Sequence, residues 1–260
     1  MHRTSVINAK GGSGKTTTVV NLAGCLAAAG KKVLLIDMDP QASASSWLGV
    51  DGSDGGLFRV LSGDQELSAT IRPSTVPGLD VIPSWLGMWQ ADKMLAAEPG
   101  AELILRQHVR QLPEQWDHLL IDGPPSLGVL AWSAMCAAQN ILVPCEATML
   151  ACQGMANLVQ AVNNLAQRID DGIKISGVVA CRVDTRTKHS LGAVSLLKQS
   201  FPDAIYETVI RENTRLKEAP GCQLPIHLYD KTSNGAKDHQ ALADEFIKRM
   251  EGVTDERQAA

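Results

Sequence analysis

Two lysines five residues apart, in a glycine-rich segment, are the side chains with the clearest chemistry. The segment 8–17 reads NAKGGSGKTT, follows the apolar run Ser5-Val6-Ile7 and precedes a stretch with helical character. Glycines leave backbone N–H groups free to surround phosphates, the Lys15 ammonium can reach the β- and γ-phosphates, and the Thr16 hydroxyl can bind Mg²⁺. The start of a helix also favours anions. We therefore expect a P-loop, whose phosphate-binding residues are Gly11, Gly12, Ser13, Gly14, Lys15, Thr16 and Thr17.

Lys10 is the unusual member of this segment. It stands at the start of the loop and cannot easily fold back onto phosphates that Lys15 of the same chain already holds. The nucleotide of a second subunit is a more plausible target for its ammonium group. The sequence thus predicts that Lys10 acts across a dimer interface.

Aspartates at the ends of two expected strands complete the phosphate site. Asp37 and Asp39 follow one apolar strand, and Asp122 ends the apolar run Leu119-Leu120-Ile121. Ligands bind beyond the carboxyl ends of the strands in a doubly wound sheet, so these carboxylates should lie beside the P-loop. A buried strand that ends in Asp meets the requirement of a Walker B element, whose carboxylate reaches the Mg²⁺ shell. For Asp39, a simple role in capping the turn at Pro40 is the alternative.

These three segments, in this order, resemble the ParA/MinD superfamily of ATPases. Its deviant Walker A reads KGGxGKT[ST], with a first lysine that acts across the dimer, its first switch reads DxDPQ[GA] and its second switch DxPPSLG. The resemblance extends from Ser5 to about Met250 and implies ATP and Mg²⁺ as cofactors. It implies that Lys10, Lys15, Asp39 and Asp122 are catalytic, and that Asp39 orients the attacking water or helps hold the metal with Thr16 and Asp122. Gly123, in the second switch, is free to change its backbone conformation, so its N–H can report the γ-phosphate; a tight turn is the alternative reason for glycine there, and both can hold.

Two further segments resemble ParA blocks close to MxDxRT and TxIPRNVRLSEAP. They are Arg182–Thr187 and Thr208–Pro220. The resemblance implies adenine binding by Arg182, Ile210 and Asn213. It also implies nonspecific DNA contacts by Arg186, Arg215 and Lys217. The chain departs from the family in having Arg-Glu-Asn for Pro-Arg-Asn and Lys217 for Ser, and Glu212 adds a negative charge beside this cationic surface.

The elements that must position these residues alternate between strands and helices. This pattern predicts an α/β fold with a single doubly wound, mostly parallel sheet and helices on both faces; the resemblance places it in the SIMIBI class of P-loop NTPases. We expect one ATPase domain over residues 1–252 and a frayed tail over 253–260. The expected strands are Thr4–Asn8, Lys32–Asp37, Leu79–Pro83, His118–Asp122, Asn140–Pro144, Lys174–Arg182 and Ala204–Ile210. The expected helices are Thr16–Ala29, Ala101–Gln111, Cys152–Arg168, Leu191–Ser200 and Ala236–Glu251.

Composition restricts the setting in which the chain works. Its 260 residues are 45% hydrophobic and 20% charged, as in an ordinary globular protein. The start has no signal-peptide pattern, no apolar run is long enough to cross a bilayer, and the six cysteines form no CxxC pair, so we expect a cytoplasmic protein with reduced thiols. The chain begins directly at the first expected strand, as in the short Soj-like type without an N-terminal DNA-binding extension.

Charge gives only local support to DNA binding. The formal net charge is −4, but residues 182–248 hold ten Lys or Arg against nine Asp or Glu. The remainder of the chain carries the negative excess, and dimerisation would double a modest basic surface.

The leading hypothesis is an ATPase that forms a homodimer with ATP, binds nonspecific DNA and positions or partitions a cargo. The cargo is a chromosome or plasmid partition complex, or a protein compartment such as a carboxysome or chemoreceptor cluster. A ParB-like or cargo adaptor protein and DNA would stimulate a weak ATPase, and the ATP-bound form would associate with the nucleoid. Three alternatives remain: a MinD-like membrane-surface ATPase, an iron–sulfur reductase, and a nucleotide-gated binding module with negligible turnover. The acidic character of the last helix disfavours the membrane alternative, and the missing cysteine pairs disfavour the reductase.

Overall fold

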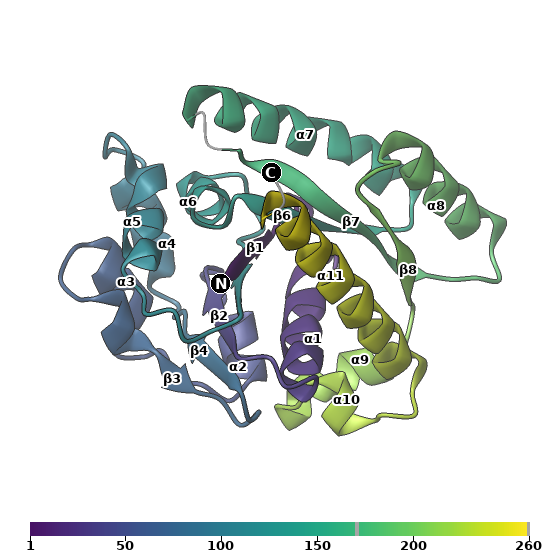
Figure 1. Ribbon diagram of the computed structural model, residues 1–260, viewed down its shortest axis with the longest axis horizontal. Coiled ribbons are helices and arrows are strands. Elements are labelled where there is room, and N and C mark those ends of the chain that lie inside the picture. The colour runs from purple at the N-terminus through teal and green to yellow at the C-terminus, as the bar shows by residue number, and fades with distance from the viewer. Residues whose placement is uncertain (170–171, 259–260) are drawn as a thin grey trace.

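Eight strands form one sheet in the computed structural model, which describes residues 1–169 and 172–258 (Figure 1). The strand order is β3-β4-β2-β5-β1-β6-β7-β8, and every neighbouring pair is parallel except β3 with β4. The strands are β1 His2–Val6, β2 Val33–Asp37, β3 Arg72–Pro73, β4 Leu79–Ile82, β5 His118–Asp122, β6 Asn140–Glu146, β7 Lys174–Val183 and β8 Ile205–Arg211. This sheet confirms the expected α/β, mostly parallel fold class.

Helices cover both faces of the sheet (Figure 1). The α-helices are α1 Lys15–Ala28, α2 Ser43–Trp47, α3 Gly56–Leu61, α4 Met88–Leu95, α5 Ile104–Arg110, α6 Val129–Ala138, α7 Met149–Ile169, α8 Lys188–Ser200, α9 Arg215–Glu218, α10 Ile226–Tyr229 and α11 Asn234–Gln258. The 3₁₀ turns are η1 Leu67–Thr70, η2 Ala101–Leu103 and η3 Ala219–Cys222. Helices α1 and α11 pack together on one face, and α5, α6, α7 and α8 lie on the other.

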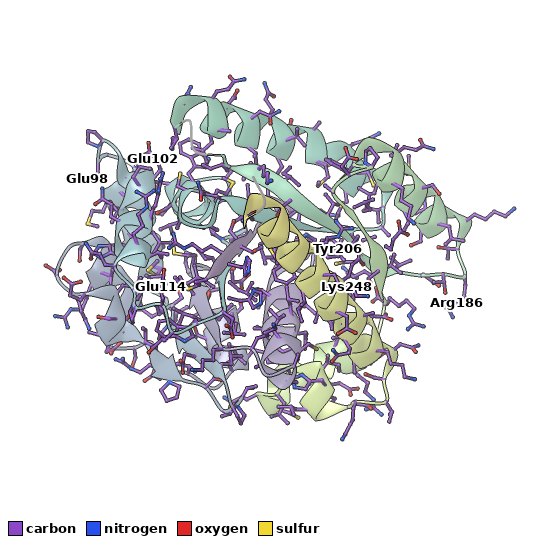
Figure 2. The ribbon with its side chains drawn as sticks, viewed as in Figure 1. Glu98, Glu102, Glu114, Arg186, Tyr206 and Lys248 are labelled. Carbon is purple, nitrogen blue, oxygen red and sulfur yellow. The ribbon has the colours of Figure 1, made fainter. Side chains whose placement is uncertain are left out.

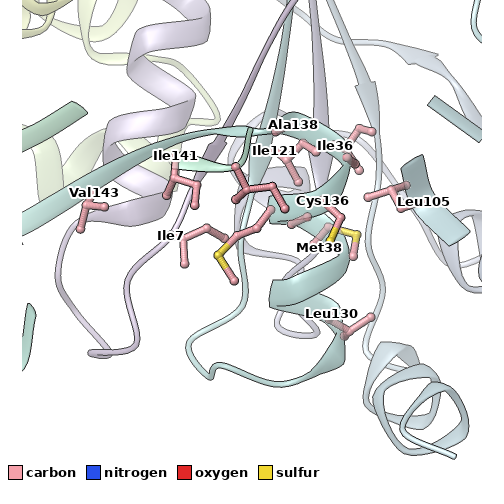
Figure 3. Close-up of a cluster of buried hydrophobic side chains, with 14 of the residues drawn as sticks. Ile7, Ile36, Met38, Leu105, Ile121, Leu130, Cys136, Ala138, Ile141 and Val143 are labelled. Carbon is pink, nitrogen blue, oxygen red and sulfur yellow. The ribbon is translucent and has the colours of Figure 1, made fainter. Parts of the chain in front are cut away.

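Alternate residues of each central strand belong to two separate cores. In β2, Leu34 and Ile36 face one core, whereas Val33 and Leu35 face the core under α1 and α11. Figure 3 shows part of the first core, where Ile36, Ile121 and Ile141 lie close to α6 residues. Side chains alternate across a strand, so a strand buried on both faces must be apolar at almost every position. This requirement explains the uninterrupted apolar runs that predicted the central strands.

The expected strands all exist, with ends that differ by up to two residues. The largest omission was α6, whose residues read VLAWSAMCAA and are apolar around most of the helix. It is buried between the sheet and α5, so it lacks the one-sided apolar pattern by which helices are recognised. Helix α11 continues to Gln258, past the expected boundary at 252, and residues 259–260 of the expected tail lie outside the described residues.

The carboxyl ends of β1, β2 and β5 meet at one edge of the sheet and position the site. Val6 and Asp37 both lie in register with Asp122, which ends β5 between them. The chain therefore leaves three adjacent strands at the same level, and the loops that follow must lie side by side.

Candidate functional site

A cavity of about 390 Å³ opens at this edge of the sheet. The P-loop forms one wall, and segments from β2, β7 and β8 form the others. Predicted site residues on its wall are Gly11, Gly12, Gly14, Lys15, Thr16, Thr17, Asp39, Arg182, Ile210, Asn213 and Lys217. Ser13 and Asp122 are buried behind the wall, and Lys10, Arg186 and Arg215 lie outside it. The fold thus brings the predicted phosphate and adenine residues together.

The P-loop depends on its glycines for its shape. Gly12 and Gly14 have φ of +72° and +96°, a conformation that other residues rarely adopt. A Cβ atom at Gly11 or Gly12 would meet no atom within 4 Å, so these glycines leave open space around the backbone. Helix α1 begins directly afterwards at Lys15. The loop is therefore an open backbone cradle at a helix N-terminus, as phosphate binding requires.

Lys15 is buried at the base of this cradle. Its Nζ donates to the Lys10 carbonyl over 3.4 Å and so points back across the loop. Burial lowers the pKa of Lys15, while the charges of Asp122 and Asp39 oppose that change. A buried cation at this point suits a ligand of high negative charge.

Thr16 and Asp122 form the expected metal-binding pair. The Thr16 hydroxyl donates to Asp122 Oδ2 over 2.8 Å, and Asp122 Oδ1 is buried with no hydrogen-bond partner among the described residues. Burial raises the pKa of Asp122 well above its usual value, and the charge of Asp37 raises it further. Burial also raises the pKa of Asp37 to about 6, against hydrogen bonds from Ser45 and Asp39. A divalent cation would stabilise both charged carboxylates, so these residues fit Mg²⁺.

Asp39 caps a turn and also lies on the cavity wall. Its Oδ1 accepts the Gln41 N–H over 2.9 Å, which is the capping role weighed as the alternative. Its backbone N–H donates to Asp37 Oδ1 over 3.1 Å. The turn therefore holds the Asp39 carboxylate beside the P-loop, and the two roles are compatible.

Lys10 points away from the cavity in this structure. Its Nζ lies 2.6 Å from Glu146 Oε2, at the end of β6. Asn8 fixes the loop beneath it, because its Oδ1 accepts the Lys10 N–H and its Nδ2 donates to the Pro144 carbonyl. The prediction that Lys10 acts on a second subunit stays a prediction, but within one chain this lysine binds a carboxylate.

Arg182 lies between two carboxylates at the expected adenine wall. It approaches Glu146 at 3.4 Å and Glu212 at 3.2 Å. Its φ is +54°, which is uncommon for a residue with a side chain. Such backbone strain is concentrated at functional sites, and it fixes the Arg182 side chain beside Ile210 and Asn213.

The three predicted DNA-contacting cations each pair with a carboxylate. Arg186 is 87% exposed and binds Asp184 through two nitrogens, which lowers the pKa of Asp184 to about 2. Arg215 binds Glu218 over 2.8 Å. Lys217 binds Glu212 over 2.6 Å, so the unusual Glu212 does neutralise part of this surface.

Gly123 has a packing role in addition to the one expected for it. Its N–H donates to the Val6 carbonyl over 3.1 Å, and its response to the γ-phosphate stays a prediction. A Cβ atom here would lie 2.2 Å from Ile7 Cδ1. Close packing against β1 is therefore sufficient to require glycine.

Four residues near the site were missed by the sequence analysis: Asn8, Ser45, Ser84 and Glu146. Glu146 could have been found, because it ends a strand beside β1. The two serines and Asn8 act through hydrogen bonds to residues of other elements, such as Ser84 with Asp39 and Asn8 with Pro144 of β6, for which the sequence carries no pattern. Among the described residues, no helix has the length and apolar content needed to cross a bilayer.

Comparisons with known proteins agree with this geometry. A family model described as an AAA domain matches residues 1–175. The sporulation initiation inhibitor protein Soj of Bacillus subtilis is 37% identical over 93% of this chain and 96% of its own length. The chromosome partitioning protein ParA of Myxococcus xanthus is 34% identical over 94% of this chain and 87% of its own. A crystal structure of cobyrinic acid a,c-diamide synthase from Mycobacterium smegmatis, with bound ADP and magnesium, has a TM-score of 0.83 and 28% identity, covering 96% of each chain.

Proposed function

This chain belongs to the ParA/MinD superfamily of ATPases, and we propose that it dimerises with ATP, binds DNA nonspecifically and positions or partitions a cargo. Hydrolysis resets the cycle when a partner protein stimulates it. The cofactors are ATP and Mg²⁺, in line with the ADP and magnesium bound to the similar M. smegmatis structure. The ATP-bound dimer works on the nucleoid.

One observation carries this proposal. Lys15, Thr16 and Asp122 meet at the open glycine cradle, and Asp122 retains a buried oxygen without a partner among the described residues. This combination holds the phosphates of a nucleotide together with a divalent cation. The chromosome partitioning protein ParA of M. xanthus, which matches 94% of this chain, supports the cargo-positioning role.

The chain's own residues divide the chemistry between them. Lys15 and the loop N–H groups bind and orient the phosphates. Thr16 and Asp122 would hold Mg²⁺, and the bound cation would supply positive charge beside the transferred phosphoryl group. Asp39 orients the attacking water from the cavity wall.

Lys10 completes the site of the second subunit in this proposal. Two nucleotides that face each other bring many negative charges together, and a lysine from each side offsets that repulsion. To do so, Lys10 must leave Glu146. Their contact is 42% exposed at the lysine, and exposed ion pairs contribute only about 0–1 kcal/mol, so phosphates can displace Glu146.

The DNA surface comprises Arg186, Arg215 and Lys217 of both subunits. A ParB-like or cargo adaptor protein is the partner that stimulates hydrolysis. The membrane alternative is less well supported, because Leu242, Phe246 and Met250 of α11 are already buried against the sheet and α1. A helix whose apolar face packs in the core has little left to insert into lipid.

Nucleotide binding and turnover of Lys15→Ala test the proposal. The substitution removes the buried cation at the phosphates, so the affinity for a fluorescent ATP analogue should fall about 100-fold or more. Wild-type affinity in this variant would refute the P-loop assignment. Wild-type protein should hydrolyse ATP slowly alone and faster with DNA, and tight ATP binding with no turnover under either condition would instead favour a nucleotide-gated binding module.

A further inference from the structure

Two buried serines connect Asp39 with the loop that follows β4. Ser84 Oγ donates to the Asp39 carbonyl over 2.7 Å, and the Ser84 N–H donates to Ser45 Oγ over 3.0 Å. Ser45 Oγ donates in turn to Asp37 Oδ2 over 2.7 Å. We call Ser45 and Ser84 the serine relay. It joins Asp37, at the end of β2, with Asp39, two residues further along the chain.

The relay is inaccessible to solvent. Ser84 is 2% and Ser45 1% exposed, while Asp37 is fully buried. Water therefore cannot replace a missing partner. Loss of the Ser84 hydroxyl would leave the Asp39 carbonyl with the Ala42 N–H alone, at 2.9 Å, and loss of the Ser45 hydroxyl would leave the Ser84 N–H unsatisfied. For this reason these bonds constrain the loops more strongly than the exposed ion pairs at the rim of the site.

Asp39 is held from both sides of its backbone. Asp37 Oδ1 accepts its N–H, and Ser84 donates to its carbonyl. The backbone of Asp39 is therefore held in place, and its side chain Oδ1 accepts the Gln41 N–H at the cavity wall. A shift of this backbone would move the carboxylate relative to the phosphates bound by the P-loop.

Ser84 is itself fixed by a third loop. A Cβ atom on Gly52 would lie 2.2 Å from the Ser84 carbonyl oxygen, so the segment between α2 and α3 packs directly on this residue. Three loops, which follow β2, α2 and β4, therefore converge on Ser84. This close packing leaves Ser84 little freedom to move away from Asp39.

We propose that Ser84, acting with Ser45, is a positioning residue for the water-orienting carboxylate of Asp39. Neither serine is among the residues that line the cavity. The relay fixes the first switch loop, which contains Asp37 and Asp39, in the conformation in which the Asp39 carboxylate orients the attacking water. This inference rests on the proposed function, because it assigns to Asp39 the role given there.

Single-turnover hydrolysis by Ser84→Ala is the first test. The rate constant should fall about 10-fold, as for other losses of outer hydrogen bonds at catalytic sites, while the Kd for a fluorescent ATP analogue stays within about twofold. Ser133→Ala is the matched control, because Ser133 is equally buried in α6 and its hydroxyl has no partner among the described residues. It should hydrolyse ATP at the wild-type rate.

A double-mutant cycle with Asp39→Ala separates positioning from folding. If Ser84 acts through the Asp39 carboxylate, Ser84→Ala should change the residual rate of Asp39→Ala by less than about twofold. Its effect on urea unfolding should be the same in both backgrounds, because the Asp39 carbonyl remains. Ser45→Ala should also slow hydrolysis, and the double serine variant should be about as slow as the slower single one.

Two results would overturn the inference. A wild-type rate in Ser84→Ala would show that the relay does not position Asp39, and an equal rate loss in both Asp39 backgrounds would show a structural role alone. Wild-type protein that hydrolyses no ATP, even with DNA, would instead refute the proposed function and this inference with it.

Discussion

Lys10 and Lys15 belong to one loop, but their side chains differ in burial and in the groups that they contact. Lys15 is buried and points across the cradle, whereas Lys10 is half-exposed and binds Glu146 outside the cavity. A buried, oriented ammonium suits a permanent phosphate ligand. An exposed ammonium with a weak partner suits a group that changes partners when a second subunit arrives.

The position of Lys10 predicts the behaviour of its variants. Lys10→Ala should bind ATP as a monomer, since Lys15 and the cradle are intact, but should not form the ATP-dependent dimer. Lys10→Arg keeps the charge, but its planar guanidinium does not match a site for a compact ammonium, so dimerisation should be impaired. Light scattering after size-exclusion chromatography, on an Asp39→Ala background that suppresses hydrolysis, measures both. Glu146→Gln is the matched control and should still dimerise; a stable ATP dimer of Lys10→Ala would refute the role across the interface.

His239 gives the chain a defined dependence of stability on pH. It is fully buried in α11 with its Nδ1 2.9 Å from the Gly235 carbonyl. Burial lowers its pKa to about 4 from 6.5, against the hydrogen bond with Gly235 and the charge of Asp238. Between these values the unfolded chain binds the proton that the folded chain excludes, so the free energy of unfolding falls as the pH falls. From pH 6.5 to 5.5 this group should remove about 1 kcal/mol.

Urea unfolding at both pH values measures this loss. His239→Gln lacks the titrating group, so its free energy of unfolding should change less than that of the wild type between the same pH values, whatever its absolute stability. Equal changes in both proteins would mean that His239 is not protonated on unfolding.

At the scale of elements, Gly123 shows how closely the strand ends pack. A Cβ atom there would lie 2.2 Å from Ile7 Cδ1 and 3.0 Å from the Val6 carbonyl oxygen. Gly123→Ala should therefore reduce the free energy of unfolding by about 1–3 kcal/mol, as other overpacking substitutions do. Gly192→Ala in α8 is the control, because a Cβ there meets nothing within 4 Å and should increase stability by about 0.5–1 kcal/mol. Urea unfolding that ranks the two variants the other way would contradict this account.

Elements with a strong pattern could be predicted from the sequence, and elements without one could not. Strand β5 was predicted with both ends correct, because the apolar run Leu119–Ile121 lies between His118 and Asp122 and is followed by a Gly-Pro-Pro turn. Helix α6 was missed because it is apolar on nearly all sides. Helices α2 and α9 were missed because, with five and four residues, they are too short to show a helical pattern. Helix α8 begins three residues earlier than expected, where Thr187 caps it by accepting the Ser190 N–H.

The residues of the site also fall into those that the sequence predicts and those that it does not. The phosphate-binding residues follow one another in the chain, so the segment around Lys15 could be recognised from the sequence alone. The partners of Asp37 and Asp39 come from α2 and from the loop after β4. Nothing in the sequence around Ser84 indicates that the fold brings it to Asp39, since this contact exists only after β4 has paired with β2.

At the scale of the whole molecule, charge is distributed unevenly. Figure 2 shows Glu98, Glu102 and Glu114 on one side of the molecule and Arg186 at the opposite end. With a net charge of −4, a single chain has no general attraction for DNA. Its three predicted DNA contacts are moreover paired with carboxylates of the same chain. If the chain binds DNA as proposed, we therefore expect a dimer, which presents these three residues twice, to be the form that binds.

DNA binding should accordingly require ATP, be independent of base sequence and weaken steeply with salt. If Arg186, Arg215 and Lys217 of both subunits contact phosphates, the dimer neutralises about six of them, and affinity should fall about 10³-fold between 50 and 200 mM salt.

Combined replacement of Arg186 and Arg215 by Glu should abolish DNA binding but leave the ATP dimer intact, whereas Glu212→Gln releases Lys217 and should raise the affinity for DNA. Fluorescence anisotropy with two unrelated duplexes, on the Asp39→Ala background, measures each case. An Arg186→Glu/Arg215→Glu dimer that still binds DNA would place the surface elsewhere, and Lys231 and Lys237, beside the cleft between α10 and α11, would be the next cations to replace.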